Sequence, residues 1–318
     1  MELVRDFTKI NKNDNQLAGG KGASLGEMTQ AGINVPGGFV VLAAAFERFM
    51  EETGAGKKIN AILGKVNRDE NYSVVAASER IRKQILKVKM PEDIAKVILQ
   101  AFDDLGAEYV AVRSSATAED GHDHAWAGQL ESYLNIAKKD VVDKVILCWS
   151  SLFTPRAIFY RIEKGLQGAK ISVAVVIQKM VESEISGVAF SVHPLTEDKN
   201  QLIIEASFGL GEAIVSGLIT PDTYTVSKDP LRVLETNISI KDRALCRAKN
   251  SSGDSNEWLT IMEPKASESA LAEGQILELS KIIIAIERHY GFPCDIEWAY
   301  ESGKFFIVQS RPITTLNK

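Results

Sequence analysis

The chain has 318 residues, which is enough for two domains or for one large domain with two lobes. Its 45% hydrophobic and 25% charged residues are typical of a globular protein, and its formal net charge of -5 argues against a general nucleic-acid-binding protein. The N-terminus has no apolar signal core, and the apolar runs are too short to cross a bilayer, so we expect a cytoplasmic protein without a membrane partner. The three cysteines are scattered, which predicts neither a disulfide framework nor a zinc site.

The first third of the chain is predicted to be mostly helical. Residues 15–32 contain a glycine-rich turn followed by a short helix, and residues 35–54 predict a turn, a short strand and a second helix. Apolar residues recur at helical spacing through residues 57–105, with a break at Pro91. This part of the chain is expected to be mainly scaffold.

Strands become frequent after residue 108. The expected elements are strands at 109–112, 171–181, 187–192 and 223–227, helices at 140–164 and 267–290, a strand–turn–helix unit at 201–217, and a final hairpin at 295–315. Residues 241–262 are expected to be irregular. The polar loop at 113–129 is long for a compact domain, and such loops are often functional or disordered. The fold class is therefore mixed α+β.

Two basic residues stand where a phosphate could bind. Lys21 lies among three glycines just before a helix, where free backbone N–H groups and the helix dipole favour an anion. The GxxxxGK[ST] spacing of a Walker A loop is absent, and the alternative is a plain glycine turn with a solvated lysine. Arg113 emerges from a buried strand into a hydroxyl-rich loop, which suits anion binding, although an ion pair with Glu119 or Asp120 would explain it equally well.

The C-terminal hairpin carries a second polar set. Asp295 and Glu297 alternate along one predicted strand, so they share a face, and Gln309 and Arg311 do the same on the next strand. Carboxylate and amide oxygens suit Mg²⁺, and an arginine suits phosphate. The alternative is a buried ion pair between Glu297 and Arg311.

A shared metal role requires Glu297 and Gln309 to lie on the same face of the hairpin. A two-residue turn in a regular hairpin would place them on opposite faces, whereas a three-residue loop at residues 301–303 would pair Asp295 with Gln309. We therefore predict the three-residue loop, a positive φ at Gly303, and all four polar side chains on one face, toward a cleft.

The sequence also resembles the N-terminal ATP-binding domain of the phosphoenolpyruvate synthase, pyruvate phosphate dikinase and rifampin phosphotransferase family. The resemblance runs in family order over nearly the whole chain. The segments that carry it are GGKGASLGEM, VPGGFVV, AVRSSATAED, WAGQLESYLNI, CWSSLFTPRA, VVIQKMV, SGVAFS, ASFGLGEAIVSGLITPDTY, DIEWAY and FFIVQSRPIT. It implies an ATP-grasp-like fold with an N-terminal lobe at residues 1–178, a C-terminal lobe at residues 179–318, and ATP held between them.

The resemblance further implies a role for each candidate site residue. Lys21, Arg113 and Arg311 would contact the phosphates as the catalytic residues, while Glu297 and Gln309 would hold Mg²⁺. The other residues expected to contact the nucleotide are Gly128, Ser132 and Tyr133 over the phosphates, Gln178 and Met180 at the adenine, and Asp295 beside the metal ligands.

In this family the pyrophosphoryl group of ATP passes to a histidine on a swivelling domain, leaving AMP, and a barrel domain then phosphorylates pyruvate or another acceptor. The threonine–glycine–glycine run that precedes that histidine is missing from the sequence. The expected partner is therefore a domain or subunit that carries the histidine and the barrel. Two alternatives remain open: an ATP-sensing module without turnover, and a carboxylate–amine ligase, which would form ADP.

Overall fold

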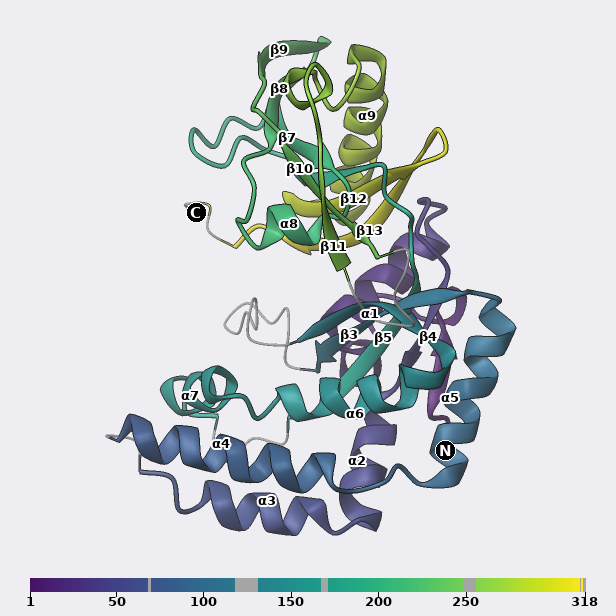
Figure 1. Ribbon diagram of the computed structural model, residues 1–318, viewed down its shortest axis with the longest axis vertical. Coiled ribbons are helices and arrows are strands. Elements are labelled where there is room, and N and C mark those ends of the chain that lie inside the picture. Colours follow the sequence, from purple (N-terminus) through teal and green to yellow (C-terminus); the bar gives the residue numbers. More distant parts are fainter. Residues whose placement is uncertain (68–69, 118–130, 167–170, 249–255, 315, 317–318) are drawn as a thin grey trace. The chain divides into compact units, whose positions relative to one another are not determined.

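A computed structural model describes residues 1–67, 70–117, 131–166, 171–248, 256–314 and 316 (Figure 1). The chain forms two compact units. The first comprises Met1–Glu27 and Gly37–Met180, and the second comprises Met28–Pro36 and Val181–Lys318. In the part of the chain that is described, no helix combines the length and apolarity that a membrane span requires.

The first unit is built on a five-stranded antiparallel sheet with the strand order β1-β2-β5-β3-β4. Its strands are β1 (Val4–Asp6), β2 (Gly38–Val41), β3 (Tyr109–Ala116), β4 (Ser132–Ala137) and β5 (Val173–Lys179). The paired residues Val112 and Ile177 belong to the hydrophobic core, whereas Arg113, the next residue along β3, points to the other face. The two faces of the sheet therefore have different roles.

Helices cover the core face of this sheet. They are α2 (Ala43–Glu52), α3 (Ala55–Leu63), α4 (Asn71–Leu86), α5 (Glu92–Leu105), α6 (Val141–Ser151) and α7 (Pro155–Glu163). Helices α2, α5 and α6 pack on the strands, and α3, α4 and α7 pack mainly on other helices. Trp149 of α6 is fully buried against Phe46 and Phe49 of α2. Local signals fix the helix ends: Thr154 accepts a hydrogen bond from the Ala157 N–H ahead of α7, and Gly106 ends α5 in the left-handed conformation.

Helix α1 (Asn15–Gln30) packs on the opposite face, the one that carries Arg113. A Cβ atom at Gly22 would lie 3.1 Å from Val40. Val40 and Arg113 both pair with Val176 of β5, one on each side, so the three side chains share a face. The helix is kinked at Gly19, whose φ is 67°. The predicted glycine turn is thus a break inside one helical segment.

The second unit contains a six-stranded antiparallel sheet with the order β13-β12-β6-β7-β8-β9. The strands are β6 (Ile185–Phe190), β7 (Gln201–Phe208), β8 (Asp222–Lys228), β9 (Leu231–Asn237), β12 (Cys294–Glu301) and β13 (Lys304–Pro312), with the short helix α8 (Glu212–Val215) after β7. Helix α9 (Glu273–Tyr290) lies on the face to which Lys228 points, because Lys228 forms an ion pair with Glu287 of α9.

The mixed α+β class is confirmed, but several predicted boundaries were wrong. Residues 241–262 were expected to be irregular, and they instead contain β10 (Arg243–Arg247) and β11 (Asn256–Thr260), which pair as a two-stranded sheet. The sequence pattern did not predict these strands, because charged residues and a polar connection flank the apolar cross-strand pair of Leu245 and Trp258. Strands β1, β4 and β9 were not predicted, and α9 begins six residues later than expected, after a short 3-10 helix. The ATP-grasp-like architecture stays a prediction.

Candidate nucleotide and magnesium site

In the first unit, Arg113 and Gln178 form a buried polar pair on the α1 side of the sheet. Arg113 is 9% exposed and Gln178 is 2% exposed. Arg113 pairs with Val176 of β5, and Gln178 lies two residues further along β5, so both side chains point to the same face. The Arg113 Nη1 donates to the Gln178 Oε1 over 3.4 Å. The structure therefore places a fixed positive charge beside an amide in a largely desolvated position.

The glycine turn is anchored next to this pair. Ser115 shares the face of Arg113, and its Oγ accepts a hydrogen bond from the backbone N–H of Gly22 over 3.3 Å. A Cβ atom at Gly19 would lie 2.2 Å from the same Oγ, so a glycine is required for this close approach. Lys21 is partly buried. Its segment is held by the hydrogen bond to Ser115, which lies two residues after Arg113 on β3.

The remaining predicted residues of the first unit are only partly brought together. Ser132 pairs directly with Arg113 and shares its face, while Tyr133 pairs with Val112 and points to the helix-covered face. There the Tyr133 hydroxyl donates to Glu131, and Lys144 lies 5.0 Å from the centre of its ring. This placement gives Tyr133 a packing role and lends no support to nucleotide contact. Met180 follows β5, and its N–H donates to the Tyr109 carbonyl, whereas Gly128 lies outside the described residues.

The C-terminal hairpin turns through two residues, so the predicted three-residue loop was wrong. Glu301 pairs with Lys304, and Ser302 and Gly303 have φ values of 49° and 80°. Two positive φ values are typical of a type I′ turn, whose twist matches that of the strands. The positive φ predicted for Gly303 is confirmed. The Glu184 side chain accepts a hydrogen bond from the Ser302 N–H over 2.8 Å, which helps to hold a non-glycine residue in this conformation.

A β-bulge restores the side-chain arrangement that the loop was expected to give. Trp298 pairs with Ile307, but Glu297 pairs with Gln309, so β13 has one extra residue at Val308. As a result, Asp295, Glu297, Gln309 and Arg311 share one face, as predicted. Helix α9 lies on the other face of the sheet. Lys228 contacts α9, and the residues on its face of β8, β7, β6 and β12 alternate along the strands with those on the face of the polar set.

Within this polar set the side chains form two contacts. The Gln309 Nε2 donates to the Glu297 Oε1 over 3.0 Å, and the Arg311 Nε and Nη2 reach the Asp295 Oδ2 over 2.7 and 2.6 Å. The ion pair is thus with Asp295, whereas the alternative considered from the sequence was Glu297 with Arg311. Burial raises the pKa of Asp295 above its usual value, although Arg311 acts in the opposite direction.

Glu205 joins the same face and was missed by the sequence analysis. Val188 of β6 pairs with Glu297 on one side and with Glu205 of β7 on the other, so the three residues form one row across three strands. Burial, and then the negative charge of Asp295, raise the pKa of Glu205. The signal for this residue was a single carboxylate inside the apolar run QLIIEAS.

These donor sets fit magnesium and a polyphosphate. Mg²⁺ commonly binds one or two carboxylates together with substrate phosphates, and Glu297, Gln309, Asp295 and Glu205 supply oxygen atoms on one face. In the first unit, the Gln178 Nε2 is buried and makes no hydrogen bond within the described ranges, so a bound acceptor would satisfy it. Both sets therefore have the chemistry that an ATP–magnesium complex needs.

Replacing Glu205 with glutamine is expected to stabilise the unliganded second unit at neutral pH. A raised pKa means that the folded state favours the protonated carboxyl, so ionisation of Glu205 lowers stability as pH rises from its unfolded to its folded pKa. Above this window Glu205→Gln removes the cost of burying the ionised carboxylate and the repulsion from Asp295. Thermal unfolding of the variant and the wild type without Mg²⁺, at pH 4 and pH 7, would measure the difference. Equal or lower stability of the variant at pH 7 would contradict this account of Glu205.

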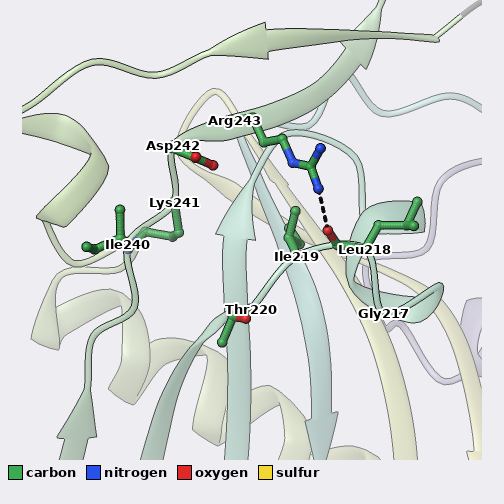
Figure 2. Close-up of a pocket in the computed structure, with 8 residues that line it drawn as sticks. All are labelled: Gly217, Leu218, Ile219, Thr220, Ile240, Lys241, Asp242 and Arg243. Atoms are coloured by element: carbon green, nitrogen blue, oxygen red, sulfur yellow. Dashed lines mark hydrogen bonds between the residues drawn. The ribbon is translucent and has the colours of Figure 1, made fainter.

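A separate hollow in the second unit contains none of the predicted site residues (Figure 2). It is lined by residues 217–220 and 240–243, and the Arg243 Nη2 donates to the Leu218 carbonyl over 2.9 Å. The Arg243 guanidinium also stacks 4.4 Å from the centre of the Trp258 ring. Arg243 thus holds β10 to the segment before β8.

The chain is similar over nearly its whole length to a known family and to several known proteins. The family described as "Pyruvate phosphate dikinase, AMP/ATP-binding domain" matches residues 15–318. A probable phosphoenolpyruvate synthase of Archaeoglobus fulgidus is 49% identical over 97% of the chain and 41% of the relative. A probable phosphoenolpyruvate synthase of Methanocaldococcus jannaschii is 44% identical over 100% of the chain and 27% of the relative. Rifampicin phosphotransferase of Bacillus cereus is 40% identical over 99% of the chain and 36% of the relative. The chain thus spans less than half the length of these relatives, and it belongs to the family of pyruvate phosphate dikinase AMP/ATP-binding domains.

Proposed function

We propose that this domain binds ATP with Mg²⁺ and donates the pyrophosphoryl group of ATP to a histidine on a separate domain or subunit, leaving AMP. One phosphate would then be released by transfer to water, and the phosphoryl group left on the histidine would ultimately phosphorylate pyruvate. The observation that carries the proposal is the hairpin set, in which the bulge at Val308 brings Glu297, Gln309, Asp295 and Arg311 to one face. Carboxylate and amide oxygens beside an arginine suit a metal-bound phosphate chain.

Each residue has a defined task in this proposal. Lys21, Arg113 and Arg311 bind the phosphate oxygens and offset their negative charge, and Glu297 and Gln309 hold Mg²⁺, with Asp295 orienting Arg311. Bound Mg²⁺ neutralises charge on the phosphates. None of these side chains acts as a nucleophile, because transfer of a phosphoryl group depends mainly on positioning and charge neutralisation. The acceptor histidine can therefore come from elsewhere.

The proposal extends to the architecture and to the partner. The polar sets of the two units would serve the same nucleotide in an ATP-grasp-like arrangement. The partner would carry the phosphorylatable histidine and the pyruvate-binding barrel, in line with relatives that are more than twice as long as this chain.

The final acceptor can be decided only with that partner. Two of the relatives above bear the name phosphoenolpyruvate synthase, which favours pyruvate. The likeness to a rifampicin phosphotransferase makes an antibiotic hydroxyl the second candidate. A domain that only senses ATP would show no turnover with any partner, and a carboxylate–amine ligase would release ADP.

The chain alone is expected to bind MgATP but to turn it over very slowly, because the proposed acceptor histidine lies on a separate domain or subunit. Calorimetry measures the binding, and separation of the nucleotides by chromatography measures the turnover. Addition of a partner protein with the histidine and barrel should produce AMP and a phosphorylated histidine. Rapid, steady formation of ADP by the purified chain would contradict the proposal, and so would the absence of MgATP binding.

A further inference from the structure

The contact with Arg113 determines which end of the Gln178 side chain is free. A guanidinium group has only donors, so the Gln178 carbonyl oxygen must face the Arg113 Nη1, 3.4 Å away. The amide nitrogen then points to the other side. This orientation follows from the identity of the neighbouring group and does not depend on telling nitrogen from oxygen in the amide itself.

The free end of Gln178 is a buried donor. The side chain is 2% exposed, and its Nε2 has no hydrogen-bond partner among the residues that the structure describes. Leaving such a group unsatisfied costs free energy, and buried polar atoms of this kind are normally paired. A ligand that supplies an acceptor would remove this cost, so the Nε2 indicates a contact with a ligand.

The neighbours of Gln178 favour an anionic acceptor. Gln178 lies on the same face as Arg113, and their side chains are in contact, so an acceptor that reaches the Nε2 lies beside a guanidinium charge. The helix α1 turn that carries Lys21 is fastened at Ser115 on this same face. An anionic oxygen gains from the Arg113 charge, whereas a neutral ring nitrogen of adenine gains little from it.

We propose that the Gln178 Nε2 binds a phosphate oxygen of the nucleotide, next to Arg113, instead of the adenine base that the family resemblance implied. The inference rests on the proposed function, since it assumes that the first unit binds a nucleoside triphosphate. Gln178 then has two roles: its oxygen holds the Arg113 side chain, and its nitrogen donates to the anion that Arg113 binds.

The test compares ATP with inorganic tripolyphosphate, which has the phosphates but no base, in the presence of Mg²⁺. Gln178→Glu keeps an oxygen for Arg113 but replaces the donor with a negatively charged oxygen, whereas Gln178→Met is the decisive variant, because it removes the donor without adding a charge. If Gln178 contacts the phosphates, calorimetry should show about a tenfold to hundredfold loss of affinity, by the same factor for both ligands. Gln178→Met should also weaken both ligands equally.

The control is Gln201→Glu, the same change on β7 of the second unit, which should leave both affinities unchanged. Circular dichroism of each variant checks its fold. The inference is wrong if ATP loses about tenfold more affinity than tripolyphosphate, because this would place Gln178 at the adenine, and also if neither affinity changes. Failure of the wild-type chain to bind ATP at all would instead overturn the proposed function, so the two failures are distinguishable.

Discussion

Replacing Asp222 with alanine is expected to lower the free energy of unfolding of the second unit by about 3–5 kcal/mol, because it leaves a buried charge without its partner. The carboxylate of Asp222 and the ammonium group of Lys241 are 2.6 Å apart, and neither side chain has any exposed surface. A buried charge is costly unless an opposite charge compensates it, and Asp222 supplies that charge for Lys241.

Asp222 also accepts hydrogen bonds that join distant segments. Its Oδ1 accepts from the Ser239 N–H over 2.9 Å, and its Oδ2 accepts from the Ala270 N–H over 2.8 Å and from the Tyr224 hydroxyl over 3.1 Å. Strand β8 is thereby tied to the segment before β10 and to the segment before α9. The alanine variant would leave the Ser239 and Ala270 N–H groups without this acceptor, and among the described residues the Lys241 ammonium group would keep only the Ser239 carbonyl oxygen, which is neutral. These losses place the expected effect toward the upper part of the range.

Urea denaturation followed by far-UV circular dichroism would measure this loss. The matched control is Asp242→Ala, which removes the same charge twenty residues later at an exposed position and should change the stability by no more than about 0.5 kcal/mol. Similar stabilities of the two variants would show that the Asp222–Lys241 pair does not hold the second unit together.

The parts of the fold that could be predicted from the sequence are those with strong apolar periodicity. The long helices were predicted because their apolar residues recur at helical spacing, and the buried strands β5 and β7 because each is a short, nearly continuous apolar run. The pair β10 and β11 was missed because its pattern is short and carries charges at its ends. Its pairing depends on contacts across the sheet that a local pattern does not contain.

The hairpin shows why the candidate site could be predicted only in part. The polar side chains were expected on one face, and they are, but by a different route: a two-residue turn combined with a bulge at Val308. A bulge changes the face of every later residue, and nothing in the letters FFIVQSRP distinguishes its position.

Register also accounts for the face on which Tyr133 lies and for the carboxylate that was missed. The pairing of β3 with β4 shifts between Val110 and Val112, near Asn135, whose φ is 59°, and Tyr133 lies opposite Val112 on the helix-covered face. Glu205 lies two strands away from Glu297 and 92 positions earlier in the chain, so only the sheet order brings these two carboxylates to one row.

The affinity for ATP is expected to fall about tenfold to hundredfold in each of the variants Lys21→Ala and Arg113→Ala, because each loses a charge-assisted contact with phosphate worth about 1.5–3 kcal/mol. Arg113 is fixed by its burial and by Gln178, so little ordering of its side chain is needed on binding. Arg113→Lys keeps the charge but loses the planar pair of donors, and an intermediate loss is expected.

Since Arg113 is buried, circular dichroism must show that each variant is folded before calorimetry with MgATP is interpreted. Lys96→Ala, at an exposed position of α5, provides the control for a lost positive charge. Unchanged affinity in both alanine variants would remove Lys21 and Arg113 from the phosphate site, whereas a loss shared by Lys96→Ala would reduce their effect to one of net charge.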